Sequence, residues 1–367
     1  MSNPRARLAA INALPLPERV RILHLSGDQE RAISQSQLRR LLPPQVELLA
    51  GPGCAATVCP SEDIQQAVQL AMVQGVTLLT DEALLRIPGP IGADVPRSLA
   101  EAQATGADIR TVSAPIEAVV LAREMPGREV VLFLAGFETL LVPLAGQLLE
   151  GLPENLSLLL CGRRVESLLE ESAWSPLADF DALILPGNHC ALLGVAGWER
   201  LAAALGKPAV VAGYSASGLL VALEALLAMV AEGGHGVINR FQSLVRDRAN
   251  PAAEARLSQV FERVGGRWRG IDRVIASAYR LRPAFARHDA DRRFPNYRPQ
   301  VGVGQDFDRG CQCRAVTYSG LAPTACAAFR GTCRPGRPVG PCMASVDGTC
   351  RIQSTAAAPS LRFAVGG

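Results

Sequence analysis

The run EVVLFLAGFET (129–139) decides the fold class of this chain. A short, continuous apolar run that ends in glycine is typical of a parallel strand buried on both faces. Runs of similar form recur along the chain, and segments with helical spacing separate them. These runs are VELLAG (46–51), GVTLLT (75–80), IRTVSA (109–114), LSLLLCG (156–162), DALILPG (181–187) and KPAVVAGY (207–214). The alternation of strands and helices predicts an α/β fold with parallel sheets.

The alternating runs fall into two blocks, which predicts two Rossmann-like lobes. We expect an N-terminal arm over 1–45, a first α/β lobe over 46–135, a second α/β lobe over 136–300, and an irregular cysteine-rich segment over 301–367. Within the second lobe we predict a helix over 252–265. Ligands of open α/β sheets bind beyond the carboxyl ends of the strands. The loops expected there are GPGC (51–54), GFET (136–139), PGNHC (186–190) and AGYSAS (212–217).

The composition excludes several classes of protein. Hydrophobic residues make up 49% of the chain and charged residues 19%, with a net charge of +3, so a large core is expected. No basic stripe interleaved with aromatic residues indicates a nucleic-acid partner. No apolar run is long enough for a membrane span, and the first twenty residues lack the apolar core of a secretory signal. We therefore expect a cytoplasmic protein, in which a cysteine cluster more often binds metal than forms disulfides.

Six of the ten cysteines lie in GCQCRAVTYSGLAPTACAAFRGTCRPGRPVGPCMASVDGTC (310–350). A segment this rich in glycine and proline needs a covalent or metal link to hold one shape. Four of its cysteines are spaced C-x14-C-x6-C-x16-C, namely Cys311, Cys326, Cys333 and Cys350. Cys313 and Cys342 then remain as a pair.

This spacing favours an iron–sulfur cluster. Such a cluster needs soft thiolate ligands, normally four, and flexible loops allow distant cysteines to converge. The remaining pair could serve as a redox disulfide beside the cluster. A zinc site usually has tighter C-x2-4-C pairs. A zinc site and simple disulfides remain the alternatives.

The loop GPGCAATVC (51–59) presents Cys54 after a strand, with Cys59 five residues later. A following helix N-terminus would lower the pKa of a nearby thiol, which suggests a reactive or metal-binding cysteine. A tight turn with an inert, buried cysteine is the alternative. Cys161 ends an apolar strand and is expected to be a small buried hydrophobe.

Three further residues follow buried strands. Glu138 is placed to handle a proton or to orient a metal ligand, unless it only caps the helix after it. His189 and Cys190 are adjacent and offer two metal ligands, although such an isolated pair is more often structural. No phosphate-binding loop and no G-x-G-x-x-G follows a strand, so we expect no nucleotide.

Taken in order, these motifs resemble the HypD-type maturation factors of NiFe hydrogenases, over nearly the whole chain. The matching stretches are GPGC (51–54), RIPG (86–89), SLAEAQATGADIRTV (98–112), AGFET (135–139), PGNHCALLG (186–194), VVAG (210–213), WRGI (268–271) and PVGPCMASVDGTC (338–350). The resemblance implies two α/β lobes of similar topology, with a cleft between them and a C-terminal 4Fe-4S segment.

The resemblance also implies site residues and partners. It makes Cys311, Cys326, Cys333 and Cys350 the 4Fe-4S ligands, and Cys313 and Cys342 a redox pair. It implies a role in assembling the Fe(CN)2CO group of NiFe hydrogenase, with the cluster as electron source. A HypC-type chaperone and a HypE-type cyanide donor are the implied partners. We assign Cys54 and Glu138 as candidate catalytic residues, and Cys54 and Cys59 as candidate ligands of a transient Fe(CN)2CO iron.

The chain departs from the family pattern in the expected cleft. Ser26 stands where the family's CGTH motif has its cysteine, and Gln29 where it has its histidine. Thr57 replaces the second cysteine of GPGCPVC, PGHVS becomes PGNHC, and GFEP becomes GYSA (213–216). A serine hydroxyl is a poor ligand for low-spin iron because it is hard and stays protonated. We therefore expect a divergent member, and the alternatives are a 4Fe-4S thiol–disulfide redox protein or a non-catalytic scaffold of a maturation complex.

Overall fold

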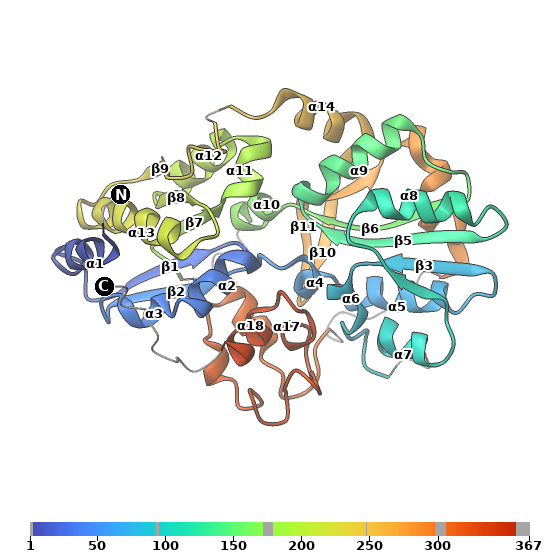
Figure 1. Cartoon of the computed structure of the whole chain (residues 1–367), viewed down its shortest axis with the longest axis horizontal. Helices are drawn as coiled ribbons and strands as arrows, with labels where there is room; N and C mark the ends of the chain where they lie inside the picture. The colour runs from blue at the N-terminus through green and yellow to red at the C-terminus, as the bar shows by residue number, and fades with distance from the viewer. Residues whose placement is uncertain (1–2, 93–94, 172–178, 247, 298–305, 357–367) are drawn as a thin grey trace, which may run out of the picture.

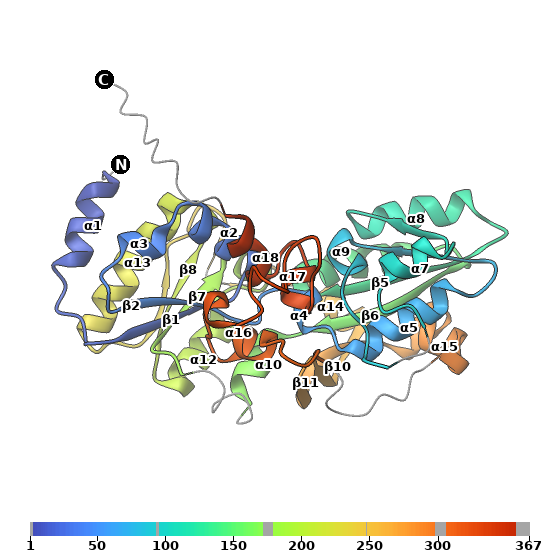
Figure 2. The same ribbon diagram turned by 90° about the horizontal axis from the view of Figure 1, so that it is seen from below.

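The computed structural model describes residues 3–92, 95–171, 179–246, 248–297 and 306–356. Two α/β lobes lie side by side, and the C-terminal segment lies across their junction (Figures 1 and 2). The predicted fold class is therefore confirmed. Of the predicted cysteine-rich segment, residues 301–305 and 357–367 lie outside the described residues.

The first lobe contains a five-stranded sheet in the order β2-β1-β7-β8-β9. Every neighbouring pair in this sheet is parallel, as predicted. Its strands are β1 (Val20–His24), β2 (Val46–Ala50), β7 (Ala182–Pro186), β8 (Pro208–Ala212) and β9 (Gly236–Asn239).

The second lobe contains a six-stranded sheet in the order β10-β11-β6-β5-β3-β4. Its strands are β3 (Val76–Thr80), β4 (Ile109–Thr111), β5 (Glu129–Gly136), β6 (Leu156–Arg163), β10 (Phe261–Trp268) and β11 (Ile271–Leu281). The strands from β3 to β6 are parallel. The β10–β11 hairpin adds two antiparallel strands at the edge of β6.

The apolar runs are continuous because both faces of each sheet are covered. Along β8, Val210 belongs to one hydrophobic core and Val211 to another. Along β5, Val131 and Leu132 are divided in the same way between two other cores. Successive strand residues point to opposite faces, so this alternation requires an apolar residue at every position.

Helices surround the two sheets. In chain order they are α1 (Pro4–Asn12), α2 (Gly27–Gln35), α3 (Leu38–Leu41), α4 (Ala55–Val58), α5 (Ser61–Ala71), α6 (Glu82–Leu85), α7 (Leu99–Ala104), α8 (Pro115–Glu124), α9 (Glu138–Glu150), α10 (Val165–Glu170), α11 (Gly187–Leu193), α12 (Ala196–Leu205), α13 (Ala216–Ala231), α14 (Pro251–Val260), η1 (Pro283–His288), α15 (Ala290–Arg293) and η2 (Pro295–Tyr297). The C-terminal segment has α16 (Cys313–Tyr318), η3 (Pro323–Ala325), α17 (Pro341–Ala344) and α18 (Thr349–Thr355).

The strands are divided between the lobes differently from the sequence-based boundaries. The predicted N-terminal arm (1–45) contains β1, a central strand that pairs with both β2 and β7. The predicted boundary at 135/136 falls inside β5, which pairs with β6 in one sheet. An apolar run predicts a strand but does not identify the strands that pair with it. Because the strands of the two sheets alternate along the chain, the predicted boundaries at 45/46 and 135/136 do not separate the two lobes.

The predicted helix over 252–265 is also corrected. It ends at Val260, and β10 begins at Phe261. Phe261 lies opposite Leu281 in the β10–β11 pairing, and its ring meets that of Tyr279 edge-on at 6.1 Å between centroids. Pairing with β11 therefore overrides the helical spacing of this stretch.

The two sheets have related strand orders. Counted within its lobe, the first sheet runs 2-1-3-4-5, and β4-β3-β5-β6 of the second runs 2-1-3-4. In such sheets the chain reverses direction beside the first strand, and ligands bind at the carboxyl ends of the strands at that point. The two reversal points lie between β1 and β7 and between β3 and β5.

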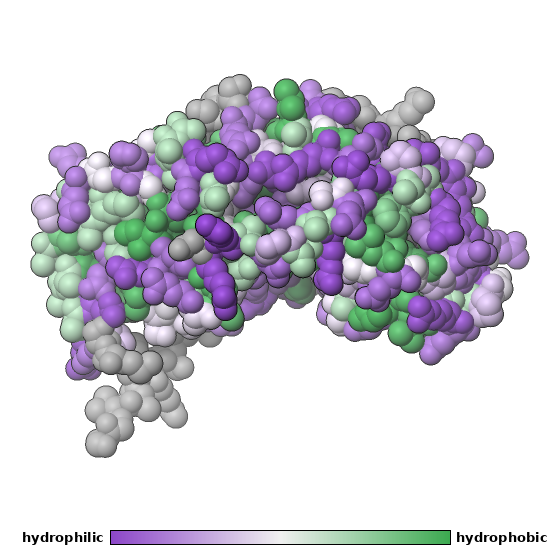
Figure 3. All heavy atoms as spheres, turned by 90° about the horizontal axis from the view of Figure 1, so that it is seen from above, coloured by the Kyte–Doolittle hydropathy of each residue, from purple (hydrophilic) through white to green (hydrophobic). Residues whose placement is uncertain are grey.

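The surface shown in Figure 3 mixes hydrophilic and hydrophobic side chains, with the hydrophobic ones in small groups. Within the described residues, no helix combines the length and the apolar character that a bilayer span needs.

Candidate functional site

One cleft receives the loops from both reversal points. It measures about 1170 Å³, including space open to solvent. It is lined by residues that follow β1, β2, β3, β5 and β7, and by one residue of the C-terminal segment. The polar or reactive members are Ser26, Asp28, Cys54, Asp81, Ser113, Glu138, Thr139, Asn188, His189, Trp198 and Asp347. The structure thus brings the predicted residues Cys54 and Glu138 into one cavity.

Cys54 is held beside Ser26 by the glycine before it. A Cβ atom at Gly53 would lie 2.4 Å from the carbonyl carbon of Leu25 and 2.4 Å from the nitrogen of Ser26. Only glycine allows the two backbones to approach this closely. The loop after β1 and the loop after β2 therefore meet in the cleft, with a serine on one and a cysteine on the other.

The Cys54 thiol is not activated in the way that its position before a helix suggested. The helix after it, α4, has only four residues. Burial raises the pKa of the Cys54 thiol, although a hydrogen bond with Ser345 opposes the effect. Its Sγ lies 3.4 Å from the Ser345 Oγ, which belongs to the C-terminal segment.

Gln29 has a structural role. Its side chain is fully buried, and Nε2 donates hydrogen bonds to the carbonyl oxygens of Leu185 at 3.0 Å and of Ala212 at 3.3 Å. These carbonyls lie near the carboxyl ends of β7 and β8. Gln29 does not line the cleft among the residues described.

Glu138 is the centre of a buried network. It lies in the first turn of α9 and is 1% exposed. Tyr279 Oη donates to Glu138 Oε1 at 2.9 Å, and His189 Nε2 lies 3.3 Å from Glu138 Oε2. Burial disfavours the ionised carboxylate, but hydrogen bonding to His189 and Tyr279 holds the pKa of Glu138 below its usual value. The residue therefore does more than cap its helix.

The indole of Trp198 fixes the orientation of His189. Trp198 Nε1 donates to His189 Nδ1 at 3.2 Å, which requires an Nδ1 without a proton. In this arrangement His189 carries its proton on Nε2, which faces Glu138.

Several members of the cleft gave no signal in the sequence. Trp198 contacts His189, nine residues before it, and Asp81 and Asp347 lie in unremarkable loops. Tyr279, which supports Glu138 from outside the cleft lining, lies 141 residues after it in the chain. His189 and Cys190 are in α11 rather than in a loop, and only His189 lines the cleft among the described residues. Cys190 is fully buried in a core.

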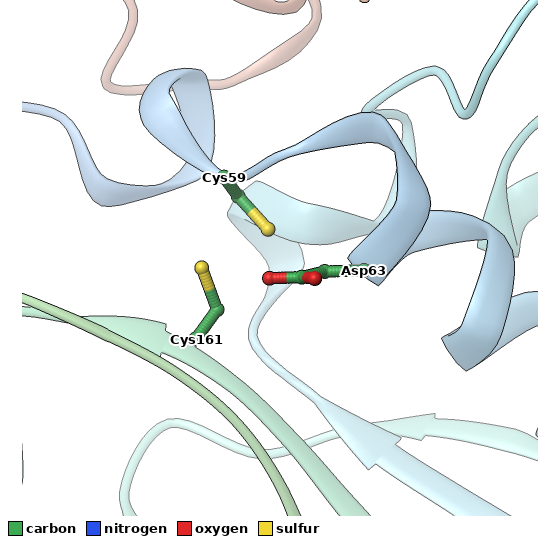
Figure 4. A group of neighbouring side chains, drawn as sticks. All are labelled: Cys59, Asp63 and Cys161. Carbon is green, nitrogen blue, oxygen red and sulfur yellow. The ribbon is translucent and has the colours of Figure 1, made fainter. Parts of the chain in front are cut away.

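The structure does not place Cys59 in the cleft, where it was predicted as an iron ligand. Cys59 is fully buried beyond α4. Its Sγ points toward Cys161 and Asp63 (Figure 4). The helical turn of α4 separates the two cysteines, and Cys59 packs into a core of the second lobe.

A second cavity lies within the C-terminal segment. Its empty space is about 290 Å³, including space open to solvent, and it is lined by five cysteines, which are Cys311, Cys313, Cys326, Cys333 and Cys350. The rest of its wall is apolar except for Gln312. All ten cysteines of the chain are free thiols. The four cysteines of the C-x14-C-x6-C-x16-C pattern therefore face one space, together with Cys313.

Backbone groups approach the sulfur atoms of this segment. The Val339 N–H donates to Cys333 Sγ at 3.3 Å, and the Cys350 N–H donates to Cys342 Sγ at 3.1 Å. A Cβ atom at Gly340 would lie 2.3 Å from Cys311 Sγ, so glycine is required there. A hydrogen bond with the Cys313 thiol lowers the pKa of Cys311 to about 7.

Cys313 and Cys342 lie close together. Both belong to one core cluster with Cys333 and Cys350, and Cys313 lines the cavity. Cys342 is in α17, and Ser345 directly after α17 contacts Cys54. A short piece of chain therefore joins the pair to the cleft.

Glu30 anchors the C-terminal segment to the first lobe. It is 1% exposed, and it accepts hydrogen bonds from Arg39 Nη2 at 2.6 Å and from Gln353 Nε2 at 3.1 Å. His24 Nε2 lies 2.8 Å from the same carboxylate. Gln353 belongs to α18, which packs on α2. The hydrogen bond from Gln353 to Glu30 therefore joins the C-terminal segment to the first lobe.

Comparisons with known proteins identify the family of this chain. A model of the HypD family, described as "Hydrogenase formation hypA family", matches residues 5–356. The chain is 32% identical over 354 residues to "Hydrogenase maturation factor HypD" of Rhodobacter capsulatus, covering 94% of this chain and 91% of that protein.

Two further relatives give the same result. Proteins called "Hydrogenase maturation factor HypD" from Rhizobium leguminosarum bv. viciae and Azotobacter vinelandii are each 34% identical. The first match covers 93% of this chain and 89% of the relative, and the second covers 94% and 92%. With a family match over almost its full length, this chain belongs to the HypD family.

Proposed function

We propose that the protein is a maturation factor of NiFe hydrogenase, which assists assembly of the Fe(CN)2CO group. The iron group is the substrate and is handled in the cleft. The C-terminal segment holds a 4Fe-4S cluster through Cys311, Cys326, Cys333 and Cys350. The observation that carries the proposal is the convergence of these four cysteines on one apolar cavity.

The cavity suits a cluster better than a single zinc ion. A tetrahedral zinc site has Zn–S bonds of about 2.3 Å, so its sulfurs lie within about 4 Å of one another. Among the described residues, no three sulfurs of the C-terminal segment lie within 4.8 Å of one another. The ligands of a 4Fe-4S cluster bind separate irons and are therefore further apart. The hydrogen bond from Val339 to Cys333 is of the kind that tunes such a site.

When bound, the cluster supplies electrons. The chain contributes the two thiols of Cys313 and Cys342, whose oxidation to a disulfide would pass two electrons through the cluster to the substrate iron group and release two protons to solvent. Their proximity to each other and to the four ligands supports this role. The contact between Ser345 and Cys54 supports a route for exchange with the cleft.

In the cleft, Cys54 is the one thiol among the described lining residues. A thiol must lose its proton to bind a metal. Because the pKa of Cys54 is raised and that of Glu138 is lowered, the metal itself would drive this loss, with Glu138 as an ionised carboxylate of the same cleft. Its Oε2 has no hydrogen-bond partner beyond the His189 contact at 3.3 Å. Tyr279 and His189 hold the carboxylate in place. Following the resemblance, a HypC-type chaperone and a HypE-type cyanide donor would bring and modify the iron.

A second candidate function has its own support. Ser26 faces Cys54 where the family pattern has a second thiol, so the cleft offers fewer soft ligands. A 4Fe-4S thiol–disulfide protein, or a scaffold for a maturation complex, needs no iron in the cleft. Both use the C-terminal segment and its partners without the cleft chemistry.

Two measurements on anaerobically purified protein test the proposal. Iron and sulfide analysis should give about four of each per chain. Zinc in their place would contradict the cluster. Infrared spectra of the complex with a HypC-type chaperone should show cyanide and carbonyl bands on iron. An intact cluster without these bands would favour the second candidate.

A further inference from the structure

A second group of metal-type ligands lies outside both sites. Cys59 ends α4, Asp63 lies in the first turn of α5, and Cys161 lies in β6. Their ligand atoms all lie within 4.8 Å of one another, and this is the one group of three such donors found in the described part of the chain. Figure 4 shows the three side chains pointing toward one another.

The group combines buried sulfur with a carboxylate that reaches solvent. Cys59 and Cys161 are 0% and 1% exposed, whereas the side chain of Asp63 is 26% exposed. Asp63 and Cys161 line a cavity of about 780 Å³ that includes space open to solvent. The cavity gives an ion a way in and leaves room for a water molecule as a fourth ligand.

The charges around the group suit a divalent cation. Two thiolates and one carboxylate carry three negative charges, so a divalent ion leaves one in excess. Arg163 Nη2 lies 3.5 Å from Asp63 Oδ2 and can balance it. Arg269 is also close, because its Nε donates to the Cys59 carbonyl at 2.6 Å. Glu62 and Asp291 add negative charge nearby, and Arg267 pairs with Glu62.

We propose that Cys59, Asp63 and Cys161 bind a zinc ion, with water as the fourth ligand. Two sulfurs and one oxygen form a set that zinc accepts in tetrahedral geometry. The ligand atoms need to close in only slightly, because tetrahedral ligands lie about 3.5 Å apart. Without metal, burial raises the pKa of Cys59 and keeps its thiol protonated, so binding displaces protons.

The ion would fix the segment that passes from β2 of the first lobe to α5 of the second lobe, which is called the crossing below. The chain leaves β2 of the first lobe, passes Cys54, and enters the second lobe at α5. Cys59 lies on this crossing, and Cys161 lies on β6 of the second sheet. A zinc bridge holds the crossing against the sheet and thereby holds the loop that presents Cys54. The inference does not depend on the proposed function, because it involves neither the cluster nor the substrate iron.

Zinc binding is tested on the full chain after the cluster has been reconstituted. The protein is incubated with one equivalent of Zn²⁺, and unbound metal is removed. We expect about one zinc per chain, and zinc K-edge absorption should show two sulfurs at about 2.3 Å and two oxygens at about 2.0–2.2 Å. A shell of four sulfurs would indicate zinc in the C-terminal segment and would overturn the proposal.

Two variants assign the site. Cys161→Ala should lose the zinc, and Asp63→Asn should bind it at least about tenfold more weakly, while both keep about four irons and four sulfides. Cys190→Ala is the matched control, since Cys190 is equally buried but outside the group, and it should keep the zinc. Asp63→Asn carries the test if Cys161→Ala does not fold. Zinc retained by both variants, no zinc in the parent chain, or a Cys59–Cys161 disulfide in peptide mapping would each overturn the proposal.

Discussion

The cleft and the C-terminal cavity place their reactive groups in opposite ways. The cleft draws single residues from loops of both lobes, and its walls are held by backbone contacts such as the one between Gly53 and Ser26. The C-terminal cavity is made by one stretch of chain, 311–350, in which the cysteines themselves form much of the wall. A ligand residue of the cleft can therefore be substituted without loss of the cleft's shape, whereas a cysteine of the C-terminal cavity cannot.

The largest effect is expected in the C-terminal cavity. Cys333→Ala removes a proposed ligand, and we expect iron and sulfide to fall from about four per chain to near zero. Cys54→Ser, in the cleft, is the matched control and should keep the full complement. Iron and sulfide analysis of anaerobically purified protein measures both. A Cys333→Ala protein with an unchanged cluster would break the distinction between the two regions.

The next effect concerns Glu30, which pairs with Arg39 in the first lobe and accepts a hydrogen bond from Gln353 of the C-terminal segment. Burial raises the pKa of Glu30, but Arg39 and His24 outweigh it and hold the pKa far below its usual value. Glu30→Gln leaves Arg39 unpaired, so we expect a loss of about 3 kcal/mol in the free energy of unfolding at pH 7. Urea denaturation measures this loss. Glu47→Gln, at a surface pair with Arg19 and a side chain 40% exposed, should lose under about 1 kcal/mol.

The same residue gives a pH dependence of defined sign. Because the folded pKa of Glu30 is depressed, its stabilisation is complete above the unfolded pKa of about 4.3. It is lost as the pH falls from there toward the folded value. The difference in stability between the parent chain and Glu30→Gln should therefore shrink below about pH 4. A difference that grows on acidification would contradict the assignment.

A change in the cleft should have a moderate effect. Ser26→Cys places a second thiol beside Cys54, and soft ligands bind low-spin iron better than a hydroxyl does. We expect iron retention in the complex with a HypC-type chaperone to rise about tenfold, as measured by the cyanide and carbonyl infrared bands. Ser113→Cys, elsewhere on the cleft wall, is the control. An equal gain from both variants would show that position in the cleft does not matter.

The smallest effect is expected behind the cleft wall. Tyr279→Phe removes the hydrogen bond to Glu138 Oε1, which should cost about 1 kcal/mol of unfolding free energy. Tyr297→Phe, outside this network, should change stability by less than about 0.5 kcal/mol. Urea denaturation of the two variants gives the comparison. Equal losses would show that the Glu138 contact contributes no stability.

The sequence predicts individual elements better than their arrangement. The runs at 129–136 and 182–186 could be predicted as strands, because a strand covered on both faces has apolar residues at successive positions. The pairing of β1 with β7 joins segments that are far apart in the chain, and no local pattern encodes it. The stretch at 252–265 has helical spacing, yet the helix ends at Val260 because the residues from Phe261 onward pair with β11.

The candidate site shows the same division. The spacing of the C-terminal cysteines indicates a common site because those residues share one segment. Cys54 and Glu138 each follow a strand, so each can be expected at the carboxyl end of a sheet. Because β2 and β5 belong to different sheets, the meeting of these residues in one cleft depends on how the lobes pack on each other, as does the contact between His189 and Glu138. The separation of Cys59 from Cys54 depends on the direction of a single helical turn.

The interleaving of the two lobes has a consequence for synthesis in the cell. Strand β1 pairs with β7, so it waits for Ala182 to be made long after Ala50 completes β2. At roughly 5–20 residues per second, this delay is on the order of ten seconds. During that time the edge of β1 that later pairs with β7 has no permanent neighbour, while strands β3 to β6 of the second lobe are made. The nascent chain therefore needs protection from aggregation, and neither lobe can be produced alone by simple truncation.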